Sequence, residues 1–198
     1  MAKIKVFVDL DDTLIDTSKL KEGLFRIIRD MGVPEEDIEP AYESSKNKHG
    51  IPILDKWVRS YPGVNPEKLR KQIEAKYLRA GTENLNRQRL EHLKKKYPPE
   101  KYELILMTKG EPEVQEWKME EIRTLNVFSD YLVIDTGKTE FLRQSETVKH
   151  GDFFILIDNS QEEREAMAGV FPQAELIDSL TIDEETKREQ EPSETREG

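Results

Sequence analysis

The chain has 198 residues, 35% of them hydrophobic and 36% charged, and a formal net charge of -10. This length suits one domain with a modest insertion, and the surplus of acids argues against nucleic-acid binding, because phosphate contacts need an excess of Lys and Arg. No apolar stretch approaches the roughly 18 residues that span a membrane, so we expect no membrane contact. The chain has no cysteine and its first residues lack a signal-peptide core, so we expect a cytoplasmic protein without disulfides.

The first apolar run, residues 4–10, predicts a buried β-strand. The following span, from about 18 to 100, contains no strand-like run and predicts a helical module. Ser18 is a candidate N-cap for its first helix, whose apolar residues share one face: Leu20, Leu24, Ile27, Ile28 and Met31. Further helical stripes occupy residues 53–61, 66–77 and 85–93.

Further apolar runs follow at residues 103–107, 131–134 and 153–157, with a weaker candidate at 174–177. These runs are continuous and not alternating, which indicates strands covered on both faces, as in a parallel sheet. Helical spacing separates them, over residues 111–125, 138–149 and 161–170. This alternation predicts a doubly wound α/β fold with a mostly parallel, five-stranded sheet.

These elements divide the chain into three parts. We assign residues 1–17 and 100–180 to an α/β core and residues 18–99 to the helical insertion. The last part, residues 181–198, holds seven acidic and three basic residues and is predicted to be a disordered tail.

Acidic residues follow the first strand at a spacing typical of a ligand site. Asp9 and Asp11 lie at its carboxyl end, and alternation along an extended chain puts both on one side. The carboxyl ends of parallel strands border the crevice in which such sheets bind ligands. An Asp at a strand end also caps turns, so these two residues alone leave a purely structural role open.

The other strand ends carry residues of matching chemistry. Thr108 follows the second strand and can hold a phosphoryl oxygen, Lys138 follows the third, and Asp158 ends the fourth. Asp9 and Asp158 can share one hard cation such as Mg²⁺, while Lys138 neutralises the clustered charge. Taken singly, Thr108 suits an ordinary turn, Lys138 a solvated surface and Asp158 a helix N-cap. Their occurrence in this order, each after its own apolar run, is a far more specific signal of a functional site than any one of these residues alone.

In this order the motifs resemble those of the haloacid dehalogenase-like (HAD) superfamily, and the resemblance covers the chain except its tail. The first family motif is similar to Asp9-Leu10-Asp11-Asp12-Thr13, and the other three are matched by Thr108, Lys138 and Asp158. The resemblance implies a helical cap after the first strand, and a first strand placed between the second and the fourth. Asn159 and Glu162 are expected to lie beside the metal, at positions where relatives often have Asp. These two departures from the family motif are expected to weaken or reshape metal binding.

The resemblance implies a phosphatase that hydrolyses a small phosphorylated metabolite with Mg²⁺ as cofactor. Asp9 is expected to attack phosphorus and form an aspartyl-phosphate, and Asp11 to transfer protons. The expected ligands of Mg²⁺ are Asp9, Asp158 and the backbone carbonyl of Asp11. Thr108 and Lys138 are expected to hold the phosphoryl oxygens.

Alternatives stay open at this point. A C–halogen hydrolase is disfavoured, because expelling a halide needs no proton and would leave Asp11 idle. A phosphomutase or phosphotransferase of the same superfamily, or a non-catalytic interaction protein with the same fold, fits the motifs too.

The cap is the expected source of substrate selection. Its candidate residues are Lys46, Lys48 and His49, although a solvated loop has the same composition. We expect a monomer or homodimer whose partner is a small phosphorylated substrate.

Overall fold

The computed structural model describes residues 3–149 and 151–190. In this part of the chain, parallel strands form one five-stranded sheet in the order β3-β2-β1-β4-β5. The strands are β1 (Ile4–Val8), β2 (Tyr102–Lys109), β3 (Asp130–Ile134), β4 (Phe154–Asp158) and β5 (Glu175–Asp178). This topology confirms the predicted doubly wound α/β fold and the position of the first strand between the second and the fourth.

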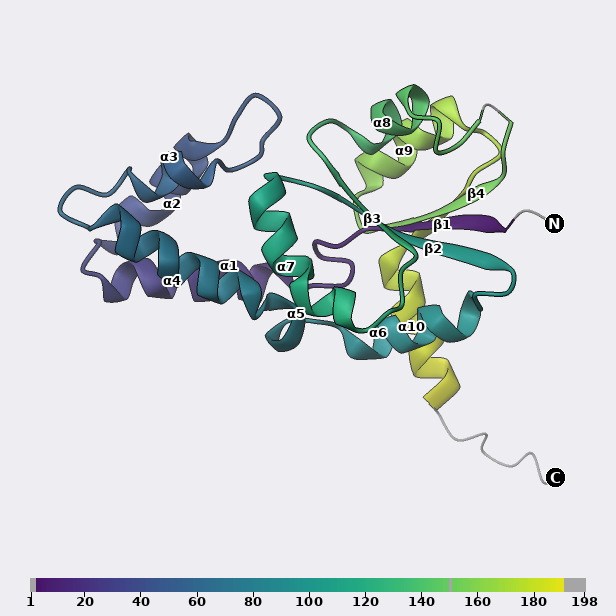
Figure 1. The fold of residues 1–198 in the computed structure, drawn as a ribbon, viewed down its shortest axis with the longest axis horizontal. Helices are drawn as coiled ribbons and strands as arrows, with labels where there is room; N and C mark the ends of the chain where they lie inside the picture. Colours follow the sequence, from purple (N-terminus) through teal and green to yellow (C-terminus); the bar gives the residue numbers. More distant parts are fainter. Residues whose placement is uncertain (1–2, 150, 191–198) are drawn as a thin grey trace.

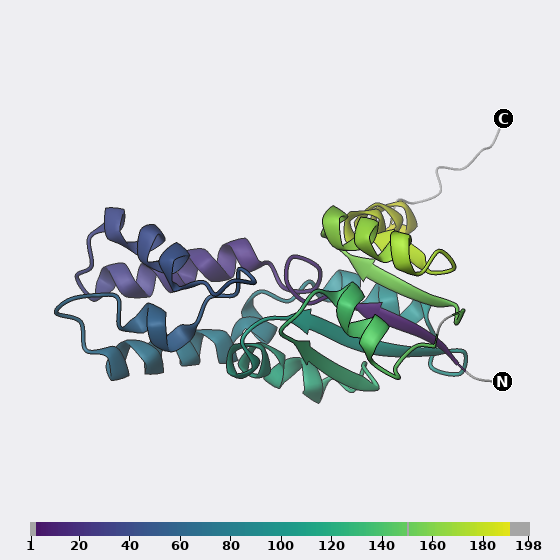
Figure 2. The same ribbon diagram turned by 90° about the horizontal axis from the view of Figure 1, so that it is seen from above.

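Helices cover both faces of the sheet (Figures 1 and 2). One face carries α8 (Lys138–Gln144) and α9 (Gln161–Val170), and the other carries α6 (Arg87–Lys96), α7 (Pro112–Thr124) and α10 (Ser179–Gln190). Successive residues of a strand point to opposite faces, so Phe7 packs with α8 and α9, whereas Val6 and Val8 pack on the other side. Because both faces are covered, the buried centres of the strands are apolar at successive positions, as in Val6-Phe7-Val8 and Leu104-Ile105-Leu106-Met107.

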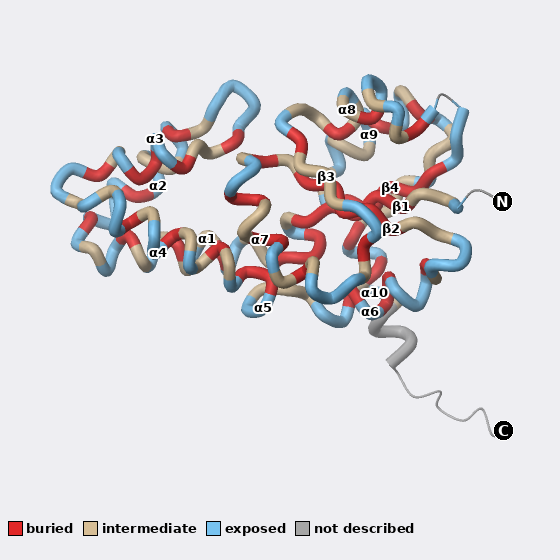
Figure 3. Tube along the Cα trace, in the orientation of Figure 1, coloured by how far each residue is buried: buried red, intermediate tan, exposed pale blue. Residues whose placement is uncertain are grey.

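The insertion between β1 and β2 forms a helical cap that extends away from the sheet (Figure 1). Its helices are α1 (Thr17–Asp30), α2 (Glu35–Ser45), α3 (Leu54–Val58), α4 (Pro66–Leu78) and α5 (Ala80–Glu83). Buried positions run along them (Figure 3), and Phe25, Tyr42 and Trp57 form an aromatic cluster with ring centroids between 5.1 and 6.3 Å apart. Asp16, and not the predicted Ser18, is the N-cap of α1. No helix among the described residues is long and apolar enough to cross a membrane.

The two linkers of the cap lie side by side. The backbone N–H of Asn86 donates to the carbonyl of Leu14 at 2.7 Å, and that of Asp16 donates to Asn84 at 3.0 Å. α6, which we assigned to the insertion, contacts α10 and packs in the same buried cluster as one face of the sheet. α6 therefore has packing partners on the core side of the two linkers.

Residues after Leu180 continue as α10, which extends to Gln190. Ile182 is fully buried, and Asp183 pairs with the buried guanidinium of Arg89, whose Nε lies 2.9 Å from Oδ1 of Asp183. The predicted tail thus begins as a helix, and two of its acids, Asp183 and Glu185, pair with basic residues of α6. The rest of that predicted tail, residues 191–198, lies outside the described residues.

Substitution of Ile182 tests whether α10 is part of the core. Ile182→Ala removes a fully buried side chain and should lower the free energy of unfolding by about 2–5 kcal/mol. Leu180→Ala is the matched control: its side chain is 63% exposed on the same helix, so its effect should stay within about 0.5 kcal/mol. Urea denaturation of both variants measures this, and equal stabilities would contradict the docking of α10.

Candidate active site

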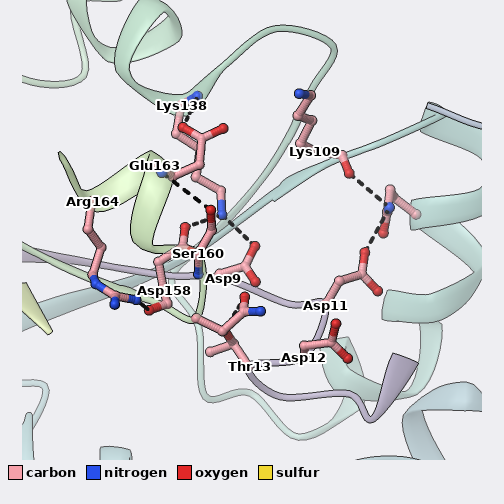
Figure 4. Close-up of polar contacts among 12 residues, drawn as sticks. Asp9, Asp11, Asp12, Thr13, Lys109, Lys138, Asp158, Ser160, Glu163 and Arg164 are labelled. Carbon is pink, nitrogen blue, oxygen red and sulfur yellow. Dashed lines mark hydrogen bonds and ion pairs between the residues drawn. The ribbon is translucent and has the colours of Figure 1, made fainter. Parts of the chain in front are cut away.

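The carboxyl ends of β1 and β4 bring two buried carboxylates together (Figure 4). Asp9 follows β1, Asp158 ends β4, and these two strands pair directly. Lys138, the first residue of α8, lies between them. Its Nζ is 2.5 Å from Oδ1 of Asp9 and also donates to Oδ2 of Asp158. Three residues that we predicted at separate strand ends thus meet at one point.

This cluster has two acidic side chains and one basic side chain. Burial raises the pKa of Asp9 to about 7, with the attraction of Lys138 opposing the shift and repulsion from Asp158 adding to it. Burial alone would lower the pKa of Lys138, but the two carboxylates outweigh it and raise that pKa. One buried ammonium group therefore faces two carboxylates, and a bound cation would neutralise the remaining charge.

Asp158 is held in place by groups that follow it along the chain. Its Oδ1 accepts the backbone N–H of Ser160 at 2.8 Å. Arg164, on α9, donates to the backbone carbonyl of Asp158 at 2.6 Å (Figure 4). These bonds fix the strand end and leave Oδ2 of Asp158 to face Lys138.

The two departures from the family motif have different surroundings. Glu162 is exposed, and its neighbour Glu163 is the acid that contacts Lys138, accepting its backbone N–H at 3.2 Å. The Ser-x-x-Glu spacing of Ser160 and Glu163 is the pattern of a capping box, but here the N–H of Ser160 donates to Asp158 and the Glu163 carboxylate accepts from Lys138 instead. Asn159 is exposed, and its Oδ1 lies 3.4 Å from the hydroxyl of Thr13, which links the two strand-end loops.

Thr108 lies near the end of β2, the other neighbour of β1. It is fully buried, and its hydroxyl oxygen has no hydrogen-bond partner among the described residues. Leaving such a group unpaired costs about 1–3 kcal/mol, so a ligand that bonds to it gains by doing so.

Asp11 turns away from Asp9 towards α7 (Figure 4). Nζ of Lys118 lies 2.7 and 2.9 Å from its two oxygens, and Thr17 and Gln115 also donate to it, at 3.0 and 3.2 Å. Burial acts to raise the pKa of Asp11, but Lys118 and these hydrogen bonds outweigh it and leave the pKa below its usual value. Asp11 is therefore held in its ionised form, and its affinity for a proton is lower than that of a free Asp side chain.

A pocket of about 300 Å³ lies beside Asp11, between the cap and the core. Its walls include Tyr42, Ile51 and Tyr77 from the cap and Val114, Gln115 and Lys118 from α7. Of the three cap residues predicted to select the substrate, the structure brings only His49 to this pocket. Lys46 pairs instead with Glu43, at 2.7 Å, and Lys48 is exposed away from the pocket lining.

The oxygens near Asp9 fit a hard cation such as Mg²⁺. Oδ2 of Asp9 accepts no hydrogen bond from any described residue, and Asp158 supplies a second buried carboxylate. No group of three acidic or histidine side chains in the described ranges can hold an ion unaided. Mg²⁺ binds few protein carboxylates and keeps several waters. Asp9, Asp158 and the backbone carbonyl of Asp11 are the groups that would hold it.

Neither a protein-family model nor a curated protein sequence matches this chain. Solved structures do resemble it. A protein described as a haloacid dehalogenase-like hydrolase from Burkholderia xenovorans has a TM-score of 0.70 and 15% identity, covering 96% of this chain and 93% of its own. The HAD-hydrolase YfnB from Bacillus subtilis, solved bound to magnesium, has a TM-score of 0.58 and 10% identity, with 94% and 99% covered.

A protein described as a β-phosphoglucomutase from Thermotoga maritima has a TM-score of 0.56 and 18% identity, covering 93% of this chain and 99% of its own. At such low identities the likeness establishes the fold. It spans nearly the whole length of each chain, the cap included. The chain therefore has the haloacid dehalogenase-like fold that its motifs predicted, with a helical insertion after β1.

Proposed function

We propose that the protein is a Mg²⁺-dependent phosphatase that hydrolyses a small phosphorylated metabolite through an aspartyl-phosphate. The observation that carries this proposal is the meeting of Asp9, Asp158 and Lys138 at adjoining strand ends. Two buried carboxylates with one ammonium group suit a site that binds a cation and a phosphoryl group together. The fold, shared with a hydrolase solved with magnesium, is consistent with it.

The proposed reaction has two displacements. Oδ2 of Asp9 attacks phosphorus, an O–P bond forms, and the bond between phosphorus and the ester oxygen breaks. A water then attacks the aspartyl-phosphate, which releases inorganic phosphate and restores Asp9. Lys138 and the buried hydroxyl of Thr108 orient the phosphoryl oxygens, and Mg²⁺, when bound, supplies positive charge for the transferring group.

Asp11 handles the protons in this proposal. Once it has turned from Lys118 and taken up a proton from solvent, it gives that proton to the leaving oxygen, and it then takes one back from the attacking water. Its ion pair with Lys118 favours the ionised form, so the first transfer requires Asp11 to turn from Lys118 towards the substrate. The Asp11 carboxylate faces Lys118 and not the carboxylates of Asp9 and Asp158. We therefore assign it to proton transfer and not to metal binding.

A phosphomutase is the second candidate, because one similar structure is described as a β-phosphoglucomutase. The two activities differ in the fate of the phosphoryl group: a phosphatase transfers it to water, whereas a mutase returns it to the sugar. Release of inorganic phosphate that matches substrate consumption identifies the phosphatase.

Asp9→Asn should lower kcat by at least about 10³-fold, because the amide is not a nucleophile. The readouts are turnover of p-nitrophenyl phosphate and trapping with beryllium fluoride, both of which should be lost. Asp12→Asn is the matched control. Asp12 adopts the left-handed conformation, with φ 56°, which Asn tolerates, so this variant should keep its activity. Wild-type turnover in Asp9→Asn would exclude the covalent mechanism.

Mg²⁺ should stabilise the folded protein, because it offsets the excess negative charge around Asp9. At ten times its Kd the expected gain is about 1.4 kcal/mol. Asp158→Asn should remove most of this gain, whereas Asp178→Asn should keep it, since Asp178 ends the neighbouring strand but pairs with Arg164. Thermal melting with and without Mg²⁺ measures the effect. A wild-type melting temperature that ignores Mg²⁺ would refute the metal assignment.

A further inference from the structure

The pocket beside Asp11 adjoins the place proposed for the phosphoryl group. Asp11 and Lys109 both line this pocket, and Lys109 directly follows Thr108, whose hydroxyl is proposed to orient a phosphoryl oxygen. An ester whose phosphoryl group lies at Asp9 would extend past Asp11 into the pocket. The lining groups that have no partner within the protein are the ones left to bind this part of the substrate.

Lys109, the last residue of β2, supplies a cation on the core side of the pocket. It is half-buried, and its ammonium group makes no hydrogen bond or ion pair with any residue in the described ranges. Figure 4 shows this group turned away from Asp11. The acids of the lining have other contacts, since Asp11 pairs with Lys118 and Glu111 accepts the backbone N–H of Leu54 at 2.7 Å. The charge of Lys109 is therefore available to a ligand.

Tyr77, from α4, lines the same pocket on the side of the cap. Its side chain is only 8% exposed and is held from the core: the ring stacks on Trp117 with centroids 6.2 Å apart, and Nζ of Lys118 lies 5.7 Å from the ring centroid. The hydroxyl of Tyr77 has no hydrogen-bond partner among the described residues. Unlike the hydroxyl of Thr108, it keeps accessible surface, so a ligand in the pocket can reach it.

The hydroxyl of Tyr77 is a hydrogen-bond donor at neutral pH. Burial raises the pKa of Tyr77 above its usual range, and the neighbouring Tyr42, Asp11 and Glu111, which also line the pocket, raise it further. The hydroxyl therefore keeps its proton. A mostly buried O–H without a partner gains from a ligand that accepts its hydrogen bond.

We propose that Lys109 and Tyr77 are specificity-determining residues that bind a second anionic group, on the leaving part of the substrate. This inference rests on the proposed phosphatase function and names its substrate class: phosphate monoesters that also carry a carboxylate or a second phosphoryl group. The ammonium group supplies positive charge, and the hydroxyl supplies a directed hydrogen bond. Hydrogen bonds to a charged acceptor are stronger than those between neutral groups, so an ester with a neutral group at this place binds less well.

The test compares pairs of esters that differ only in the second anionic group, with Mg²⁺ present. The carboxylate pairs are 3-phosphoglycerate with glycerol 3-phosphate and 6-phosphogluconate with sorbitol 6-phosphate. The phosphoryl pairs are glycerol 1,3-bisphosphate with glycerol 3-phosphate and sorbitol 1,6-bisphosphate with sorbitol 6-phosphate. In the wild type, kcat/KM for at least one anionic ester should exceed that for its neutral partner by about tenfold or more. The series that shows this preference identifies which anion the pocket binds.

Two variants each remove one of the donors. Lys109→Met deletes the charge and should bring the anionic-to-neutral ratio close to one, whereas Lys109→Arg keeps the charge and should keep most of the preference. Tyr77→Phe deletes the hydroxyl, retains the ring that stacks on Trp117, and should lower the ratio by about threefold or more. Lys101→Met and Tyr102→Phe are the matched controls. They change residues at the opposite end of β2 and should keep the wild-type ratio.

The outcomes separate the two proposals. A wild type that hydrolyses these esters with a ratio near one in every pair overturns the role of Lys109 and Tyr77 and leaves the phosphatase intact. An unchanged ratio in folded Lys109→Met or Tyr77→Phe does the same, and so does an equal loss on every ester, p-nitrophenyl phosphate included, because the residue then serves the transferred phosphoryl group. A wild type that hydrolyses none of the esters, p-nitrophenyl phosphate included, overturns the phosphatase itself and this inference with it.

Discussion

A buried ammonium group between two buried carboxylates is the constraint on which the arrangement of the core depends. Asp9, Lys138 and Asp158 are each almost inaccessible to solvent, so none of them is stable there without the others. The ion pairs form only if β1 and β4 are neighbours in parallel register, as the pairing of Val8 with Ile157 provides. A slip of one residue would turn one carboxylate to the other face of the sheet.

A second buried cation, Arg89, connects helices α6 and α10 to the loop that follows β1. Arg89 of α6 pairs with Asp183 of α10 and donates to the carbonyl of Thr13, four residues after Asp9. The acidic C-terminal segment, which its composition predicts to be disordered, thus contributes a counter-ion to the core. The loop that carries Asp9, Asp11 and Thr13 is held from one side by the sheet and from the other by these helices.

Sequence predicted the sheet because its strands are buried on both faces and therefore appear as continuous apolar runs. It missed α2, which contains Pro40 and buries few side chains, and α10, whose charges are satisfied by residues distant in the chain. In the site, the order of strand ends pointed to Asp9, Lys138 and Asp158, which the structure brings together.

The residues that contact Asp11 could not be predicted from the sequence, for a different reason. Gln115 and Lys118 are polar positions on an amphipathic helix, and such positions are usually solvated. Their partner Asp11 lies more than 100 positions earlier in the chain. Only the packing of α7 against the loop after β1 shows that both side chains face inwards.

The paired linkers of the cap have a consequence for folding. β1 and β2 are neighbours in the sheet although the whole cap separates them in the chain, so their pairing closes a long loop. A cap that forms early brings residues 14–16 and 84–86 together and shortens the segment that remains to be closed. Since closure entropy varies with the logarithm of loop length, a roughly fourfold shorter loop favours pairing by about 1 kcal/mol. In this order of events, the folded cap lowers the entropy cost of pairing β1 with β2.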